Sequence, residues 1–354
     1  MSYIKRLLLL ILCVFLLPLG GCGKDEDVAL EDTPTPPVIE TEPTETPQPE
    51  SNEPELFNSD FVLPDLSVRP IAVMIDNQGT RVLPQGGISQ AQIVYEFLTE
   101  YTITRYMLFF WGNIPDMVGP VRSARHYFLD YAMEYGAIYT HFGGSEYAKS
   151  DIKKLKINDI DGLVHGNAFW DITTDRGNWQ DSYTSKERLD KQIEALKYST
   201  EPSKDFPFSY YDMLTLPEGG TKAESIAIKY ASDNYLSYEY DEETAGYLRF
   251  RMGQPQMERN TGEQVRVTNI LIQITPSNRI ANDKEGRINL ENIGKGEGYY
   301  ITGGTVVKLK WSKAKRDEQT VYTLEDGSPV VFNRGQTWIE VIPTNNAVTI
   351  KESP

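Results

Sequence analysis

The sequence has very little cysteine and histidine, and this scarcity excludes several kinds of chemistry. Among 354 residues there are two cysteines, Cys13 and Cys22, and three histidines. Cys13 lies in a segment that we expect to be removed, so the mature chain would keep no cysteine pair for a disulfide and no thiolate for catalysis. The folded part must therefore rely on its hydrophobic core, for which the chain is long enough.

The sequence also lacks an apolar run long enough to cross a membrane. Residues 7–17 form an apolar stretch of 11 residues behind Lys5 and Arg6, too short for a hydrocarbon layer of about 30 Å and typical of a cleavable export signal. The stretch leads to Leu19-Gly-Gly-Cys22, the lipobox pattern at which signal peptidase II cleaves. We predict a signal peptide at 1–21 and acyl chains such as palmitate on Cys22, which would hold the protein on the outer face of the cytoplasmic membrane.

Residues 22–66 are poor in aromatic and aliphatic side chains. They contain eight prolines, thirteen acidic residues and one lysine, a composition that cannot bury enough apolar surface to fold. We expect a disordered, extended tether. It supplies most of the net charge of −16, so the remainder is only mildly acidic. This balance, together with export, argues against a nucleic-acid partner.

The remaining residues exceed the usual size of one domain, and their patterns change near residue 218. Residues 67–217 mix strands with helices, which predicts an α/β or α+β domain. The expected strands are 70–76, 93–100, 102–111 and 137–142, and the expected helices are 120–134 and 146–155, the second capped by Ser145. Residues 218–354 predict a mainly-β domain, a small barrel or sandwich, with strands at 225–230, 247–251, 269–274, 305–311, 329–332 and 337–342. There is no internal repeat.

Several strings resemble a known family. They are Arg69-Pro-Ile-Ala-Val-Met-Ile-Asp76-Asn77, Val94-Tyr-Glu96, Val118-Gly-Pro-Val-Arg122-Ser-Ala-Arg125, His141-Phe-Gly-Gly-Ser145, Tyr183-Thr-Ser185 and Gly335-Gln-Thr-Trp-Ile339. Together they resemble the YerB-like lipoproteins of Gram-positive-type bacteria over nearly all of 67–350. The resemblance implies a mixed N-terminal domain and a β-rich C-terminal domain, and it brings no function, because the family is a domain of unknown function.

The chain departs from that family pattern at two places. Trp179-Gln180-Asp181 stands where the family usually has Pro-His-Asn, and Glu100-Tyr101-Thr102 stands where it tends to have Glu-Gly-Gly. If the missing histidine belongs to a shared site, the site in this protein is altered.

Arg122 and Arg125 are the principal candidates for ligand binding. We expect them in the first turns of the helix that follows Gly119-Pro120, where cations are unfavourable unless an anion such as a phosphate or carboxylate compensates them. The alternative is that they pair inside the domain with Asp76 or Glu96 at neighbouring strand ends.

His141 is the best candidate among the histidines, because it ends a strand, and ligands gather at the carboxyl ends of strands. Ser145 is a possible nucleophile beside it, but no Gly-x-Ser-x-Gly motif is present and an N-cap role is favoured. The candidate ligand-binding set is Asp76, Asn77, Glu96, Arg122, Arg125, His141, Gly143, Gly144 and Ser145. No catalytic residue can be named.

The spacing of His126, His141 and His165 does not match a compact metal motif, so we expect no metal and no cofactor. The 21 tyrosines and five tryptophans are consistent either with sugar stacking or with ordinary core packing.

These features favour a tethered binding or accessory protein of the cell envelope over an enzyme. It would recognise a peptidoglycan or teichoic-acid-type polymer, or a cell-wall enzyme, through an anionic group. One alternative is an envelope enzyme acting on a phosphate- or sugar-containing substrate with Asp76, Glu96 and His141 as acid–base groups. Another is a protein-interaction module formed by the β-rich domain.

Overall fold

The computed structural model describes residues 57–175, 178, 180–343 and 347–352. The predicted signal peptide, Cys22 and most of the predicted tether lie outside these residues. In the part that is described, strands greatly outnumber helices.

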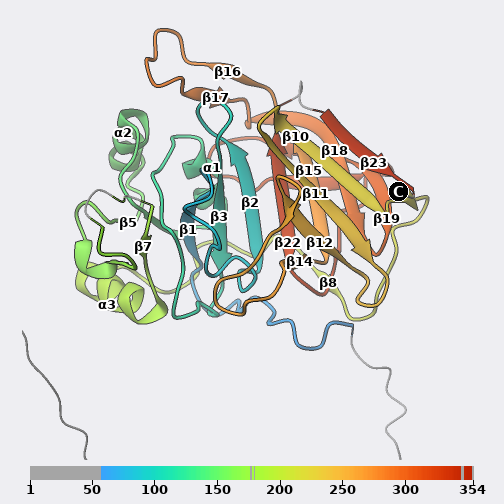
Figure 1. Ribbon diagram of the computed structural model, residues 1–354, viewed down its shortest axis with the longest axis horizontal. Coiled ribbons are helices and arrows are strands. Elements are labelled where there is room, and N and C mark those ends of the chain that lie inside the picture. The colour runs from blue at the N-terminus through green and yellow to red at the C-terminus, as the bar shows by residue number, and fades with distance from the viewer. Residues whose placement is uncertain (1–56, 176–177, 179, 344–346, 353–354) are drawn as a thin grey trace, which may run out of the picture. The chain divides into compact units, whose positions relative to one another are not determined.

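An 11-stranded mixed sheet forms the centre of the fold (Figure 1). Strand β22, close to the C-terminus, lies between β15 and β2 and is parallel to both, so both sequence regions contribute to one sheet. In spatial order the strands are β20 (Val321–Leu324), β19 (Thr305–Lys313), β18 (Gly294–Thr302), β15 (Asn269–Ile274), β22 (Thr337–Ile342), β2 (Ile93–Leu98), β3 (Thr104–Phe110), β1 (Ile71–Asp76), β4 (Ile138–His141) and β5 (Asp159–Asp161), with β9 (Thr221–Lys222) beside β19.

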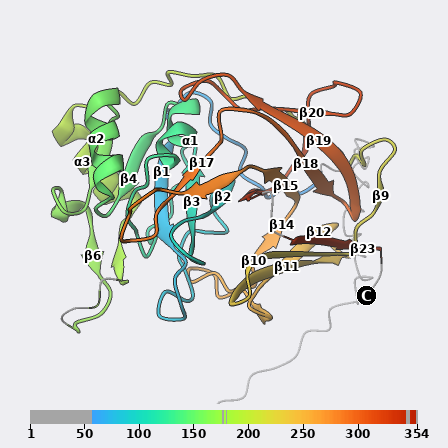
Figure 2. The same cartoon turned by 90° about the horizontal axis from the view of Figure 1, so that it is seen from above.

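A second sheet packs against one face of the large sheet, as Figure 2 shows for β10, β11, β12 and β23. Its strands are β13 (Gln254–Pro255), β12 (Gly246–Arg251), β11 (Asn234–Asp241), β10 (Ser225–Ala231) and β23 (Ala347–Lys351), with β14 (Arg266–Val267) beside β12. The arrangement confirms a mixed region followed by a mainly-β region, and the described strands form layered sheets rather than a closed barrel. Alternate residues of β10 are buried, as expected for a strand with one face against a core.

The helices are short. Helix α1 (Phe128–Glu134) packs on the opposite face of the large sheet, where Phe97 contacts Phe128 and Tyr131 at ring-centroid distances of 5.0 and 4.8 Å. The remaining elements are α2 (Glu146–Leu155), α3 (Lys186–Leu196), the 3-10 turn η1 (Gly166–Ala168) and three small strand pairs, β6 (Trp170–Asp171) with β7 (Ser182–Tyr183), β8 (Tyr210–Tyr211) with β21 (Phe332–Asn333), and β16 (Ser277–Arg279) with β17 (Ile288–Leu290).

The prediction for α2 is confirmed, and the prediction of a helix over 120–134 is wrong for its first eight residues. Ser145 accepts a hydrogen bond from the Ala148 backbone N–H and caps α2. Residues 120–127, in contrast, precede α1, and Val121 forms an isolated antiparallel bridge with Ile75 of β1. Backbone hydrogen bonds to a neighbouring strand therefore override the helical spacing of the apolar residues.

The continuous apolar strands are found close to their predicted positions, whereas several strands rich in polar residues were not predicted. Strands β1, β2, β3, β15 and β22 are almost fully buried. Strands β11 and β18 carry acids, glycines and asparagine, which weaken the pattern. The predicted strand 329–332 is reduced to a single bridge at Pro329 and to β21.

Residues 57–66, which we assigned to the tether, lie on the folded part. The Phe57 N–H donates to the Asp212 carbonyl at 3.0 Å, and the Asn58 side chain donates to the Arg334 carbonyl at 2.9 Å. The folded part therefore begins earlier than the composition indicated.

Candidate functional site

Asp76 and Arg105 lie opposite each other at the end of the β1–β3 pair and project from the same face of the large sheet. Both are buried, with exposed fractions of 0% and 2%. This is the face covered by α1, and it is the carboxyl end of β1. The fold therefore places a carboxylate and a guanidinium where ligands of open α/β sheets usually bind.

Segment 121–125 is held between β1 and the end of β4 by backbone hydrogen bonds. The Arg122 N–H donates to the Met74 carbonyl at 2.9 Å, and the Ala124 N–H donates to the Gly143 carbonyl at 2.9 Å. The expectation that Arg122 and Arg125 occupy a helix N-terminus is wrong. They reach the same end of the sheet as Asp76 through an extended segment instead.

Arg122 pairs with Asp76 across 3.1 Å, and its side chain keeps 20% of its surface exposed. The Gln180 amide donates to the same carboxylate oxygen at 3.1 Å, and the Gln78 N–H donates to the other oxygen at 3.0 Å. Gln180 stands at the position where the family resemblance implies a histidine. In this protein the group beside Asp76 is therefore the Gln180 amide, which donates a hydrogen bond but, unlike a histidine, cannot gain or lose a proton.

Arg125 forms a two-pronged pair with Glu100, in which its Nε donates at 2.8 Å and its terminal nitrogen contacts the second carboxylate oxygen. Arg105 contacts Glu100 at 3.3 Å. Burial works to raise the pKa of Glu100, but the hydrogen bond from Arg125 and the charges of both arginines outweigh it and lower that pKa. Glu100 is thus a carboxylate shared by two guanidiniums, and it was not among the predicted residues.

These five side chains carry a surplus of positive charge, because three guanidiniums face two carboxylates. Burial, followed by repulsion from Arg125, lowers the pKa of Arg105 to about 10. Burial also lowers the pKa of Arg122, which lies near Arg125. Among the described residues the Nε of Arg105 is buried without a hydrogen-bond partner. We call Asp76, Glu100, Arg105, Arg122 and Arg125 the arginine cluster.

His141 lies on the same face of the sheet as Asp76 but makes its own contacts. Its Nδ1 lies 2.7 Å from the Gly143 carbonyl, and its Nε2 lies 3.1 Å from an Asp159 carboxylate oxygen. Gly143 has a φ of +69°, which suits glycine, and its N–H donates to Asp161. Gly144 forms a parallel bridge with Ala124. These contacts give Gly143, Gly144 and Ser145 roles in holding the chain beside the cluster.

Glu96 does not join this site. It is the register partner of Tyr106 on β3, whereas Asp76 is the register partner of Arg105, so Glu96 and Asp76 project from opposite faces of the sheet. The predicted convergence of Asp76, Glu96 and His141 on one substrate is therefore wrong. Asn77, just beyond β1, donates to Glu96 at 3.2 Å and belongs with it.

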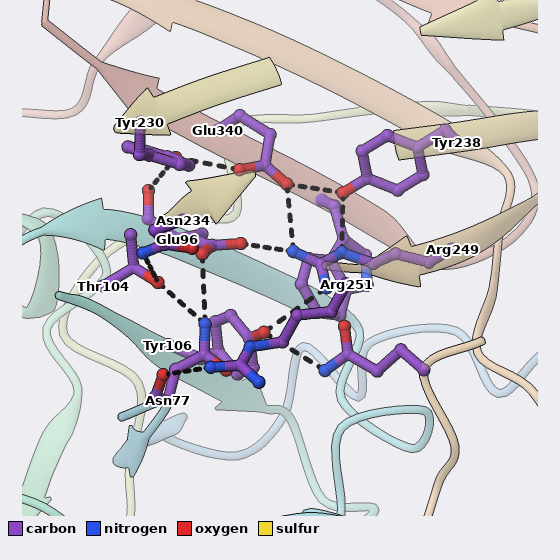
Figure 3. Close-up of polar contacts among 12 residues, drawn as sticks. Asn77, Glu96, Thr104, Tyr106, Tyr230, Asn234, Tyr238, Arg249, Arg251 and Glu340 are labelled. Carbon is purple, nitrogen blue, oxygen red and sulfur yellow. Dashed lines mark hydrogen bonds and ion pairs between the residues drawn. The ribbon is translucent and has the colours of Figure 1, made fainter. Parts of the chain in front are cut away.

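On its own face Glu96 enters a buried network between the two sheets (Figure 3). Arg249 of β12 is fully buried and pairs with Glu96, and its guanidinium lies 4.2 Å from the Trp338 ring centroid. Glu340 of β22 lies 3.7 Å from the same guanidinium and accepts hydrogen bonds from Tyr230, at 2.9 Å, and from Tyr238. We call this set the inter-sheet network.

The inter-sheet network contains two buried carboxyl groups and one guanidinium. Burial, followed by repulsion from Glu96, raises the pKa of Glu340 to about 8. Burial also raises the pKa of Glu96, although Arg249 opposes it. The sequence offered a signal for both acids, since each interrupts an otherwise apolar strand. The sequence did not indicate that Arg249 is buried, because the apolar Leu248 and Phe250 on either side of it would be expected to face the core. The structure shows the reverse, since Tyr247 and Arg249 are buried and Leu248 and Phe250 are only partly buried.

The described residues contain no group of three or more histidine, cysteine or acidic side chains placed to hold a metal ion. No helix among them is long and apolar enough to cross a membrane. Pockets of about 660, 590 and 380 Å³ lie elsewhere on the surface, lined by residues that include Trp111, Val307 and Gln336 respectively.

The mixed N-terminal region and the mainly-β C-terminal region place the chain in a class of proteins that consist of two such regions. Residues 63–199 match the family described as the Protein of unknown function (DUF3048) N-terminal domain, and residues 226–339 match the corresponding C-terminal domain. The chain is 30% identical over 290 residues to the protein named "Putative lipoprotein YerB" of Bacillus subtilis (strain 168), covering 80% of this chain and 84% of that protein. A crystal structure of the YerB protein from Bacillus subtilis matches with a TM-score of 0.71 and 28% identity, over 81% of this chain and 96% of that one. The chain belongs to the YerB-like family.

Proposed function

We propose that this protein is a lipid-anchored binding protein of the cell envelope that recognises an anionic group at the arginine cluster. Cys22 carries the anchor on the outer face of the cytoplasmic membrane. The lipobox and the name of the relative in Bacillus subtilis support this part of the proposal.

The gathering of three guanidiniums around two carboxylates, with the Arg122 side chain 20% exposed, is the observation that carries the recognition. A buried or half-buried positive charge is costly unless an anion compensates it. Arg125 is buried and paired with Glu100, so it adds positive charge to the site without contacting the ligand. Arg122 keeps part of its surface exposed while it contacts Asp76, so a phosphate or carboxylate would approach from its side.

A phosphate of a teichoic-acid-type wall polymer fits this charge and the place of the anchor. The ligand is held chiefly by charge, because the half-buried Gln180 amide beside Arg122 already donates to Asp76 and to the Gln78 carbonyl. A hydrolytic role is disfavoured, because Glu96 projects from the face of the sheet opposite to Asp76 and His141.

Sedimentation with insoluble wall fragments tests the recognition. The mature protein is mixed with walls that retain teichoic acid and with walls from which it has been removed. Only the first should bind, and Arg122→Gln should weaken binding by about tenfold, the loss expected for one charged hydrogen bond. Arg266→Gln is the matched control, because Arg266 is an exposed arginine on β14. Equal binding by Arg122→Gln and the native chain would refute recognition at this cluster.

Crosslinking in cells separates a polymer from a wall enzyme as the ligand. A protein crosslinked to the native chain but not to Arg122→Gln would identify an acidic protein surface as the ligand. The anchor is tested separately with Cys22→Ala, which should abolish acylation and release the protein from the membrane fraction.

A further inference from the structure

Large exposed apolar side chains gather in two short segments of the described chain. Sixteen such residues are present, and seven of them lie within 62–66 and 211–216. They are Val62, Leu63, Leu66, Tyr211, Met213, Leu214 and Leu216, with exposed fractions from 37% to 58%. Isolated exposed apolar residues are common, but several exposed together on one short loop, as at Met213, Leu214 and Leu216, indicate an interaction surface.

Both segments lie where the described chain begins. The Phe57 N–H donates to the Asp212 carbonyl at 3.0 Å, and the rings of Phe61 and Tyr210 lie 6.1 Å apart. Arg334 donates to the carbonyls of Asn58, Ser59 and Phe61 and fixes the first segment on the fold. In Figure 1 this segment, drawn in blue, runs along the lower edge of the fold toward β8.

The 211–216 loop is held rigidly, so its apolar side chains keep their positions. Asn333 accepts from the Thr215 N–H at 2.8 Å and donates to the Thr215 carbonyl at 2.9 Å. Leu214 and Leu216 lie against Gly303 in the turn between β18 and β19, where φ is +54° and a side chain would collide with Leu216. The exposed surface is therefore built into the fold.

We propose that the 211–216 loop docks on the lipid bilayer to which the protein is anchored, an inference that rests on the proposed lipidation of Cys22. Residues 23–56 connect the acylated cysteine to Phe57. If proline and like charges extend this connection as the composition predicts, its length is at most about 3.1 Å per residue, roughly 105 Å in all. The bilayer is thus within reach of the fold, and the loop lies at the point where the connection joins the fold.

The acidic connecting chain is a poorer occupant of this surface than the bilayer. Asp212 and Glu218 flank the apolar side chains and are exposed, so they repel a segment rich in aspartate and glutamate. The interface of a bilayer accepts leucine and tyrosine side chains.

An environment-sensitive probe on the lipidated protein tests the docking. The mature chain has Cys22 acylated and has lost Cys13, so Leu216→Cys offers a single thiol for a fluorophore. On phosphatidylcholine vesicles the emission of the probe should shift to the blue and be quenched by lipid-borne quenchers. Leu163→Cys is the control, because Leu163 is 65% exposed and follows β5, at the opposite end of the large sheet from β18 and β19.

Vesicle flotation in the same samples separates failure of the anchor from failure of the docking. Flotation with an aqueous, unquenched probe at position 216 would overturn the docking and leave the anchor intact. A chain that does not float would overturn both. A blue-shifted probe before vesicles are added would show that the connecting chain or a second copy covers the loop, and would also overturn the proposal.

Discussion

Glu96 and Glu340 are register partners on the parallel strands β2 and β22, and both approach the guanidinium of Arg249. One positive charge thus serves two fully buried carboxyl groups. The strands that carry the two acids come from opposite ends of the described chain. The two acids and Arg249 therefore lie in the contact between the second sheet and the large sheet.

Glu340→Gln should make stability less dependent on pH. The pKa of Glu340 is raised to about 8 by burial and by Glu96, above the ordinary value of about 4.3 that it has when unfolded. Between these values the folded state binds more protons, so its stability falls as pH rises, by up to about 1.4 kcal/mol per unit, and levels off above pH 8. Urea unfolding of the native and variant chains from pH 5 to 8.5 measures the difference. The exposed Glu239→Gln on β11 is the control, and parallel profiles for Glu340→Gln and the native chain would contradict this role.

Arg249→Met should destabilise the protein by about 3–5 kcal/mol, because it leaves two buried carboxyl groups without their cation. The free energy of unfolding is measured by urea titration at pH 7. Adding Glu96→Gln to this variant should restore part of the loss, because it removes one of the two stranded acids. Arg266→Met, at an exposed arginine, should have little effect. A loss equally small at Arg249 would show that the pairing is dispensable.

Asp76→Asn should strengthen binding to walls that retain teichoic acid. It removes one of the two carboxylates of the arginine cluster and raises its surplus charge from one to two, so binding should also become more sensitive to salt. Sedimentation at several salt concentrations measures both effects, and near-native circular dichroism confirms folding. Asp190→Asn, at an exposed helical carboxylate, should change neither. Weaker binding by Asp76→Asn would mean that the carboxylate itself contacts the ligand.

Ser145→Ala should lower the free energy of unfolding by about 1 kcal/mol, the usual value of an N-cap hydrogen bond. Ser145 accepts from the Ala148 N–H at 3.1 Å at the start of α2. Wall binding should be unchanged, which separates capping from a chemical role. The exposed Ser150→Ala in the middle of α2 should be neutral or slightly stabilising, and a large loss of binding in Ser145→Ala alone would contradict the capping assignment.

The sequence predicted an element correctly where neighbouring residues alone determine it. The apolar strand that ends at Asp76 and the helix capped by Ser145 were predicted correctly, because burial on both faces and a cap are local properties. The helix expected from Pro120 failed in its first part, because the N–H of Arg122 donates to Met74 on β1 and the N–H of Ala124 donates to Gly143 just after β4. Periodicity alone cannot report such partners.

The candidate site shows the same division between local and long-range information. The sequence placed Asp76 at a strand end and predicted Arg122 and Arg125 in the first turns of a helix. The structure brings the three residues together, but through an extended segment. The sequence could not reveal Glu100 as the partner of Arg125, because the pair depends on how the β2–β3 turn meets segment 121–125. It could not separate Glu96 from Asp76 either, because the face from which each projects is set by strand register.

Composition and short-range pattern alone determined the predicted anchor at Cys22, the acidic connection to the fold and the order of a mixed region followed by a β-rich region. These features depend on neighbouring residues and need no knowledge of distant contacts. Tertiary structure decided that β22 joins β2 in one sheet, that Arg249 meets Glu96, and that three arginines share two carboxylates. Each of these depends on pairing between residues far apart in the chain, and the energy of such pairs is set by burial, which only the folded protein defines.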